Sequence, residues 1–225
     1  MNFWRCMWVI LEKDLRIELR SKETIATLTL FGAVLSFVFA FGLIGDPATN
    51  LMVIPGILWI GLLFTGSLGV GRTFAREQEN GAFTALTLSP APRSAVLAAK
   101  VVSNFGLSVL SLLLITPLTA LLLHVDLMPF IGPLTIMLGL GAAGFALVGT
   151  PLAVMAVSAR FPEVLLPMVV FPLISPVLIC GVRGSAALLG TSVDMDYLPW
   201  AQIILAFDLT LGLGGFFLFE WMVSE

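Results

Sequence analysis

Two ionisable side chains in this apolar sequence are candidates for chemistry because of where they fall. Asp208 is the one acid expected inside a membrane-spanning stretch, where a charge is costly unless it faces protein or water, so it is a candidate proton carrier. A shallower position or a polar contact between subunits would explain it more simply. His124 is the single histidine, expected at the end of a span, and its imidazole could bind haem iron or respond to pH. An ordinary side chain at the membrane surface is the simpler interpretation of His124.

The sequence gives no support for nucleotide binding by this chain. The run Gly139-Leu140-Gly141-Ala142-Ala143-Gly144 matches the dinucleotide fingerprint GxGxxG, but it lies inside an apolar stretch rather than between a strand and a helix. Small residues there are better read as a surface on which helices pack closely. The chain has no GxxxxGKS or GxxxxGKT phosphate loop. We therefore expect no ATP hydrolysis through a P-loop in this chain, so that energy for any transport would come from a partner chain or from an ion gradient.

The elements that position these residues are predicted to be membrane helices. Of 225 residues, 59% are hydrophobic and 11% are charged, and the mean hydropathy is +1.07. Apolar stretches of about 20 residues recur, the length that crosses the hydrocarbon core as a helix. The sequence therefore predicts an all-α, polytopic membrane protein with a single transmembrane domain over residues 1–225.

Six spans are expected. Pro55 should fall in the first turn of the second span, where proline is tolerated. Pro167, Pro172 and Pro176 fall in the fifth span and predict a kinked helix, which either lines a transport path or is simply a packing bend. The approximate limits of the spans are 25–44, 51–70, 101–123, a segment within 128–158, 164–182 and 198–219.

Residues 1–24 predict an amphipathic helix at the membrane surface. Trp4, Trp8, Leu11 and Leu15 recur at spacings of three and four, so they share one helix face, and polar residues fill the other side from Glu12 onward. Tryptophan on one face and Lys/Arg on the other suit a helix lying in the interface plane. A plain cytoplasmic extension of the first span is the alternative.

The positions of the basic residues predict the orientation. Five Lys/Arg precede the first span, four lie within 72–100, and Arg160 lies between the fourth and fifth spans, whereas only Arg183 falls on the other side. The positive-inside rule then places both termini in the cytoplasm, which agrees with an even number of spans.

The charged stretch 72–100 is predicted to be a cytoplasmic coupling loop between the second and third spans. A short, partly apolar helix between spans is what a membrane domain offers to a soluble partner. An ordinary solvated loop is the alternative, but it would have no need for apolar residues outside the spans. The residues expected to contact this partner are Glu79, Gly81, Phe83, Thr84, Leu86, Leu88 and Pro90.

Several short segments occur along the chain in a fixed order. They are Phe3-Trp4-Arg5 with residues 14–20, Pro55-Gly56-Ile57-Leu58-Trp59, Arg72-x-Phe74, Glu79-Asn80-Gly81, Leu86-x-Leu88-Ser89-Pro90, Pro172-Leu173-Ile174-Ser175-Pro176 and Leu178-Ile179-Cys180-Gly181. Each segment is weak alone, but their order, spacing and total length are specific, and they cover essentially the whole chain. Taken together they resemble the haem exporter protein B family, the ABC-2-type (type V exporter-like) permease of bacterial cytochrome c maturation. ABC-2 permeases often carry an acid three residues after the glycine of the central loop, where this chain has Thr84.

The resemblance implies a permease subunit in the bacterial inner membrane that acts in haem delivery. Two copies would pair with two ATPase subunits, and residues 81–88 would be the coupling helix. Other cytochrome c maturation membrane proteins and a periplasmic haem chaperone would be further partners. Haem-ligating residues of the family belong mainly to those partners, so this chain would bind no cofactor firmly, with ATP held by the ATPase and haem handled by the complex.

Other functions fit parts of the same pattern. An ABC-2 export permease for a lipid, drug or polysaccharide would share the spans and the coupling loop. A proton-coupled secondary transporter would depend on Asp208 and need no ATPase. A passive anchor for a maturation complex would leave the loop without a role.

Overall fold

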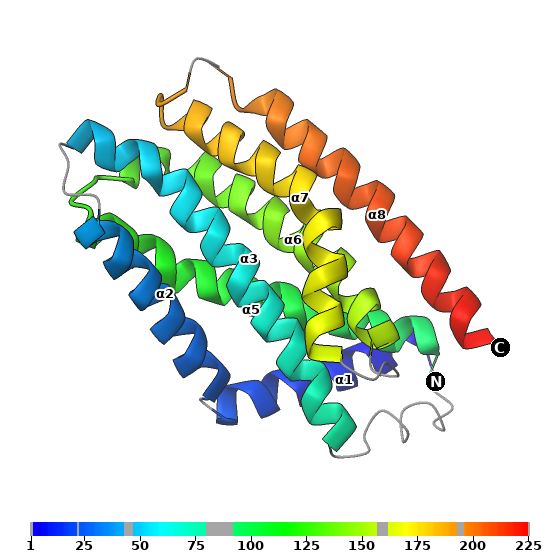
Figure 1. Cartoon of the computed structure of the whole chain (residues 1–225). Coiled ribbons are helices and arrows are strands. Elements are labelled where there is room, and N and C mark those ends of the chain that lie inside the picture. Colours follow the sequence, from blue (N-terminus) through cyan, green and yellow to red (C-terminus); the bar gives the residue numbers. More distant parts are fainter. Residues whose placement is uncertain are drawn as a thin grey trace.

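The computed structural model describes residues 2–21, 23–42, 47–79, 92–156, 162–192 and 196–224. Across these residues the chain is helical and contains no strand (Figure 1). The all-α prediction is therefore confirmed for this part of the chain. The elements are α1 (Phe3–Ser21), α2 (Glu23–Gly42), α3 (Pro47–Glu79), α5 (Arg93–Leu122), the 3-10 turn η1 (Met128–Phe130), α6 (Ile131–Ala156), α7 (Pro162–Leu188) and α8 (Leu198–Ser224).

Within the described residues, five helices are long and apolar enough to cross a membrane, so the chain is a multi-pass membrane protein. α2 has only a shorter apolar section, Ala26–Gly42, and its expected role as the first of six spans remains a prediction. The five candidate spans are Thr49–Gly71, Ser94–Leu122, Met128–Val154, Leu165–Leu188 and Leu198–Phe217.

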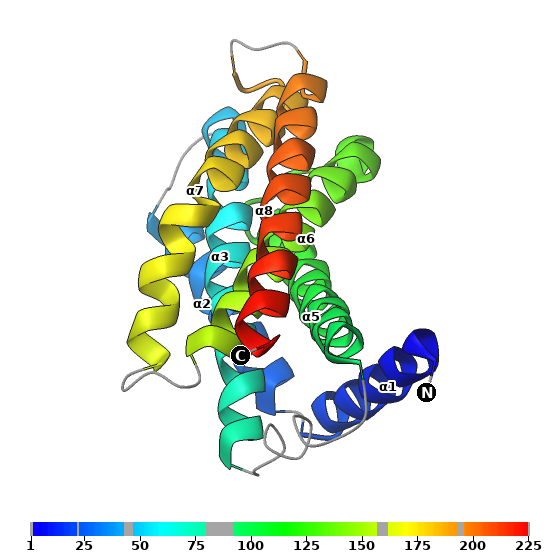
Figure 2. The same cartoon turned by 90° about the vertical axis from the view of Figure 1, so that its right-hand side faces the viewer.

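The long helices form a bundle, and α1 lies across one end of it (Figures 1 and 2). α1 packs mainly against the beginning of α5. The last turns of α8 lie at the same end of the bundle as α1, and so does the end of α3 (Figure 1). The ends of three helices and the whole of α1 thus gather on one side of the molecule.

The loop expected over 72–100 is shorter in the structure. α3 continues through the charged residues to Glu79, and α5 begins at Arg93 directly after Pro92. The reason is that Arg, Glu and Gln are good helix formers, so a helix does not stop where its apolar section stops. Hydropathy marks the edge of the membrane rather than the end of the helix.

Two further expectations need correction. Pro55 lies well inside α3 rather than in its first turn, because α3 begins at Pro47, where a proline suits the helix start. Arg183 does not follow the fifth span but lies within α7, with its guanidinium carbon 5.7 Å from the ring centroid of Trp200 in α8. This cation–π contact joins α7 to α8.

The core of the bundle forms around Trp59 of α3, which is fully buried. Gly141 of α6 and Gly181 of α7 lie against its indole so closely that a Cβ on either glycine would collide with the ring. Gly144, the last glycine of the GxGxxG run, packs in the same way against Asp208 of α8. The interpretation of this run as a close-packing surface is therefore confirmed at Gly141 and Gly144, whereas a Cβ at Gly139 would meet nothing within 4 Å.

Candidate functional site

A buried ion pair joins α1 to α5 at the end of the bundle where the coupling loop was expected. Lys100 Nζ lies 2.9 Å from Asp14 Oδ2, and the two side chains are 2% and 8% exposed. Lys13 Nζ lies 3.0 Å from the other carboxylate oxygen, Asp14 Oδ1, and is much more exposed. Lys100 was expected in a loop, so its burial in a helix is a correction to the sequence analysis.

Apolar side chains surround this pair. Ile10 and Leu11 of α1 are buried against Ala99 of α5, and Met7 and Val96 pack beside them. These contacts keep water away from the ion pair, which makes a carboxylate without its lysine partner costly at this position.

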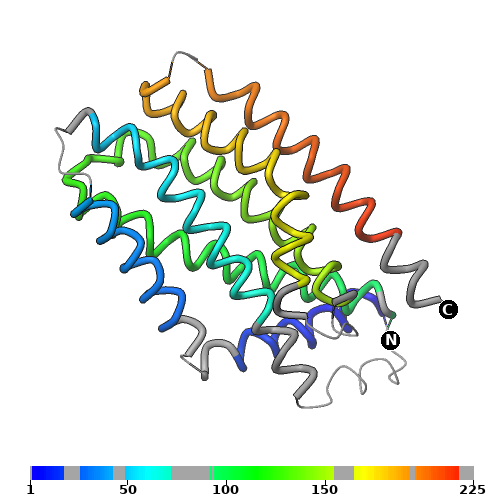
Figure 3. Tube along the Cα trace, viewed as in Figure 1, coloured from blue at the N-terminus to red at the C-terminus, as the bar shows by residue number. Residues whose placement is uncertain are grey.

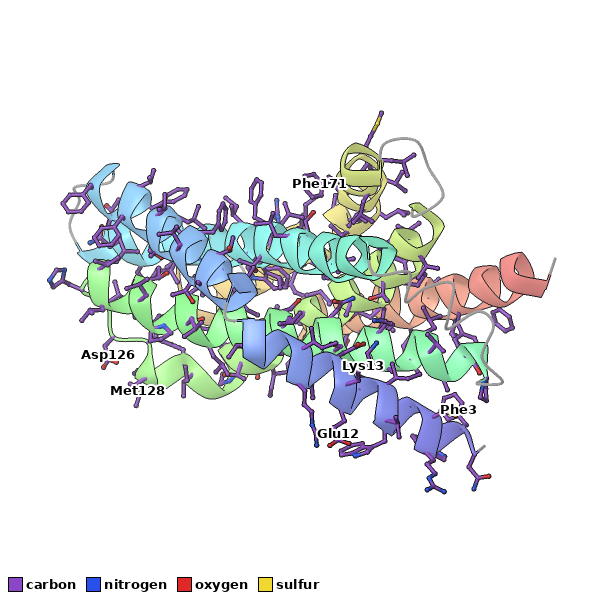
Figure 4. All side chains as sticks on the ribbon, turned by 90° about the horizontal axis from the view of Figure 1, so that it is seen from below. Phe3, Glu12, Lys13, Asp126, Met128 and Phe171 are labelled. Atoms are coloured by element: carbon purple, nitrogen blue, oxygen red, sulfur yellow. The ribbon has the colours of Figure 1, made fainter. Side chains whose placement is uncertain are left out.

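The opposite side of α1 is exposed. Trp4 and Trp8 are 73% and 65% exposed, and Leu15 is exposed as well. Leu11, which was expected on the same face, is instead buried against α5, because it lies at the edge of that face next to Ile10. Figure 4 shows Glu12 and Lys13 on different sides of α1, with Lys13 toward α5.

The residues expected to contact an ATPase are placed only in part. Glu79 is the last residue of α3, and only its backbone is described. The end of α3 and the beginning of α5 lie at the same end of the bundle as α1 (Figure 2). The other expected contacts, Gly81, Phe83, Thr84, Leu86, Leu88 and Pro90, lie outside the described residues.

A buried polar stripe runs along α5 from Lys100. Asn104 and Ser108 follow at intervals of four residues, so they share the inward face with Lys100, and Ser111 continues this face. The Asn104 amide donates a 3.0 Å hydrogen bond from Nδ2 to Thr150 Oγ1 of α6. The sequence analysis missed this stripe, although the regular spacing of polar residues in an apolar run was a signal for it.

Asp208 lies inside α8, as expected, and is 4% exposed. Its carboxylate rests on the backbone of Gly144 in α6. Neither carboxylate oxygen has a hydrogen-bond partner among the described residues. Such a residue remains a candidate for function, but the position alone does not assign one.

His124 lies at the other end of the bundle, just after α5, in a left-handed backbone conformation (φ 54°). It borders an apolar groove of about 940 Å³ between α5 and α6. The nearby Asp126 and Met128 lie at the far end of the molecule from Phe3 (Figure 4). Among the described residues, no group of three or more His, Cys, Asp or Glu could hold a metal ion. Apolar residues that line the groove include Phe105, Val109, Leu112, Leu121, Leu134 and Leu138.

The three prolines of the predicted kink, Pro167, Pro172 and Pro176, all lie inside α7. The trace of α7 changes direction part way along (Figures 1 and 3). Near this part, Phe171 makes an edge contact with Phe64 of α3, with ring centroids 6.3 Å apart. This contact packs α7 against α3.

These features define a polytopic α-helical membrane protein that gathers its charged helix ends on one side. A sequence profile of the CcmB protein family matches residues 5–218, and the chain belongs to this family. The predicted resemblance is therefore confirmed.

Individual relatives agree with the family match. The chain is 30% identical over 195 residues to a protein of Rhodobacter capsulatus named heme exporter protein B, covering 85% of the chain and 89% of the relative. A relative with the same name from Paracoccus denitrificans is 32% identical over 188 residues, covering 80% and 84%. Another from Pseudomonas aeruginosa is 29% identical over 204 residues, covering 90% and 91%.

Proposed function

We propose that this chain is the membrane permease subunit of a haem export system that serves cytochrome c maturation. The observation that carries the proposal is the family match over residues 5–218, together with relatives named heme exporter protein B that align over most of both chains. The alignment covers α1, the candidate spans and the segment between α3 and α5. The activity is thus assigned to the whole chain rather than to one motif.

The proposal includes a topology. α2 is the first of six spans of an ABC-2-type permease in the bacterial inner membrane, α1 lies in the membrane surface, and both termini are cytoplasmic. The exposed Trp4 and Trp8 support the interfacial position of α1, because tryptophan favours the headgroup level. The common location of α1 and the end of α8 supports an even number of spans (Figure 1).

The energy comes from a separate ATPase in this proposal. The chain itself is non-catalytic, and its sequence has no phosphate-binding loop. Two copies pair with two ATPase subunits, which seat residues 81–88 in a groove, while other maturation proteins and a periplasmic chaperone handle the haem. The continuation of α3 to Glu79 supports this arrangement, because a rigid helix carries movement from that groove into the membrane.

The test is affinity purification of the chain from its native membrane in mild detergent, followed by mass spectrometry. A P-loop ATPase and haem-handling membrane proteins are expected in the purified complex. Recovery without any ATPase would contradict the proposal.

A matched pair of variants sharpens the test. Phe83→Asp places a carboxylate in the proposed apolar contact, and burying that charge costs more than about 1.4 kcal/mol of binding free energy. Because about 1.4 kcal/mol corresponds to a factor of ten in affinity, ATPase recovery should fall about tenfold or more. Phe83→Leu keeps an apolar side chain and should retain the ATPase. Equal recovery with both variants would remove Phe83 from the contact.

A further inference from the structure

The ion pair between Asp14 of α1 and Lys100 of α5 has no role in the function proposed so far. We infer that it is a mechanical joint, which holds α1 and the beginning of α5 as one unit and carries movement of the coupling segment into the bundle. The inference rests on the proposed function, because it assigns positioning residues to the ATP-driven step.

Stability is a poor explanation for this pair. Burying two charges costs about as much as their attraction returns, and packed apolar side chains of similar size would hold the helices together at least as well. A contact of 2.9 Å between Lys100 Nζ and Asp14 Oδ2 has a more specific effect. It sets one rotation of α1 about its axis and one register along α5, whereas the neighbouring apolar contacts of Ile10 and Leu11 tolerate sliding.

The position of Lys100 fits a joint. α5 begins at Arg93, next to the segment expected to bind the ATPase, and Lys100 follows on the same unbroken helix about two turns, or about 10 Å, later. From Arg93 onward, movement therefore reaches Lys100 along one continuous helix.

α1 fits the other half of the joint. It rests on α5 through Asp14, Ile10 and Leu11, while Trp4 and Trp8 on its outer side remain exposed. If those tryptophans lie in the membrane surface, they hold α1 at a fixed depth. The beginning of α5 can then tilt relative to α1, which serves as its reference plane.

The same face of α5 leads onward into the bundle. Asn104 lies one turn beyond Lys100 and donates its hydrogen bond to Thr150 of α6. The same face of α5 thus contacts α1 through Lys100 and, one turn later, α6 through Asn104. Movement of the beginning of α5 is expected to reach α6 along this line.

The experiment measures the membrane complex of this chain with its ATPase. ATP hydrolysis and haem transfer to the chaperone are followed together, and the result is expressed as haem delivered per ATP hydrolysed. Asp14→Asn and Lys100→Met should each lower this ratio about tenfold or more, because each breaks the buried ion pair that joins α1 to α5. Lys13→Met, which removes only the more exposed partner of Asp14, is the matched control and should change the ratio less than about twofold.

A double variant separates a joint from a merely structural contact. Asp14→Leu with Lys100→Met replaces both charges by apolar groups and should restore thermal stability. If the pair is a joint, the amount of haem delivered per ATP hydrolysed should stay low in this stable double variant. Recovery of the ratio along with stability would overturn the inference, and so would normal ratios in both single variants.

The unmodified complex distinguishes failure of the proposed function from failure of the joint. If it shows no ATP-dependent haem delivery, the proposed function fails. If it delivers haem and the Asp14 and Lys100 variants deliver equally well per ATP, only the joint fails.

Discussion

The indole of Trp59 in α3 lies directly on the backbone of Gly181 in α7, with no room for a Cβ between them. Its N–H donates a 2.9 Å hydrogen bond to Ser185 Oγ, one turn further along α7. Gly141 of α6 also lies against the ring, with no room for a Cβ. Trp59 and Gly181 come from two of the segments that carry the family resemblance, so those distant segments meet around one buried side chain.

The first prediction concerns the space that Gly181 leaves. Gly181→Ala should destabilise the protein by about 1–3 kcal/mol, because the added methyl forces the buried indole out of its place. Thermal unfolding in detergent, followed by loss of monodisperse protein on size-exclusion chromatography, measures the effect.

Gly139→Ala is the matched control, because a Cβ there meets nothing within 4 Å. Alanine is also the better helix former, so this variant should be as stable as the original or slightly more so. Equal loss of stability in the two variants would show that the Trp59 contact is not what Gly181 provides.

The second prediction concerns the hydrogen bond between Trp59 and Ser185. A double-mutant cycle with Trp59→Phe and Ser185→Ala should give a coupling energy of about 1 kcal/mol, the usual net value of a hydrogen bond in a protein. Unfolding is measured for the original, both single variants and the double variant. Additive effects would mean that the bond contributes nothing to stability.

Much of this arrangement could be predicted from the sequence. Apolar length predicted the candidate spans, and two glycines of the run, Gly141 and Gly144, pack closely as expected. Asp208 lies inside a candidate span, as expected, because apolar residues surround it on both sides in the sequence.

The Asp14–Lys100 pair could not be predicted in the same way. Lys100 was assigned to a loop because its charge resembles that of the neighbouring arginines, and hydropathy does not distinguish a solvated lysine from a buried, paired one. Its partner lies 86 positions earlier in the chain, so local periodicity does not connect them. The side of Leu11 was also missed, since a helical pattern shows which residues share a face but not which protein surface covers it.

The third prediction concerns the outer face of α1. If α1 lies in the membrane surface, a spin label at Trp8→Cys should be reached by a lipid-soluble relaxation agent more readily than by a water-soluble one. A label at Lys13→Cys, an exposed polar position five residues further on and therefore on a different side of the helix, should show the reverse preference. The measurement is made in proteoliposomes on a background without the two natural cysteines, Cys6 and Cys180.

The same pattern at both positions would contradict the interfacial assignment of α1. Stronger access of the water-soluble agent at both would make α1 a cytoplasmic extension, and the proposed joint would lose its reference plane. Stronger access of the lipid-soluble agent at both would place α1 deeper than the headgroup level.

The last prediction separates the two sources of energy that the chain could use. Asp208→Asn keeps the size and shape of the side chain against Gly144 and removes only its ability to ionise. Because the proposed function takes its energy from ATP, haem delivery by this variant should remain within about twofold of the original, and a protonophore should not stop delivery while ATP is supplied. A proton-coupled transporter requires the opposite in both assays, with normal amounts of the variant in the membrane. That result would move the energy source from a partner ATPase to Asp208 and leave the segment between α3 and α5 as an ordinary connection.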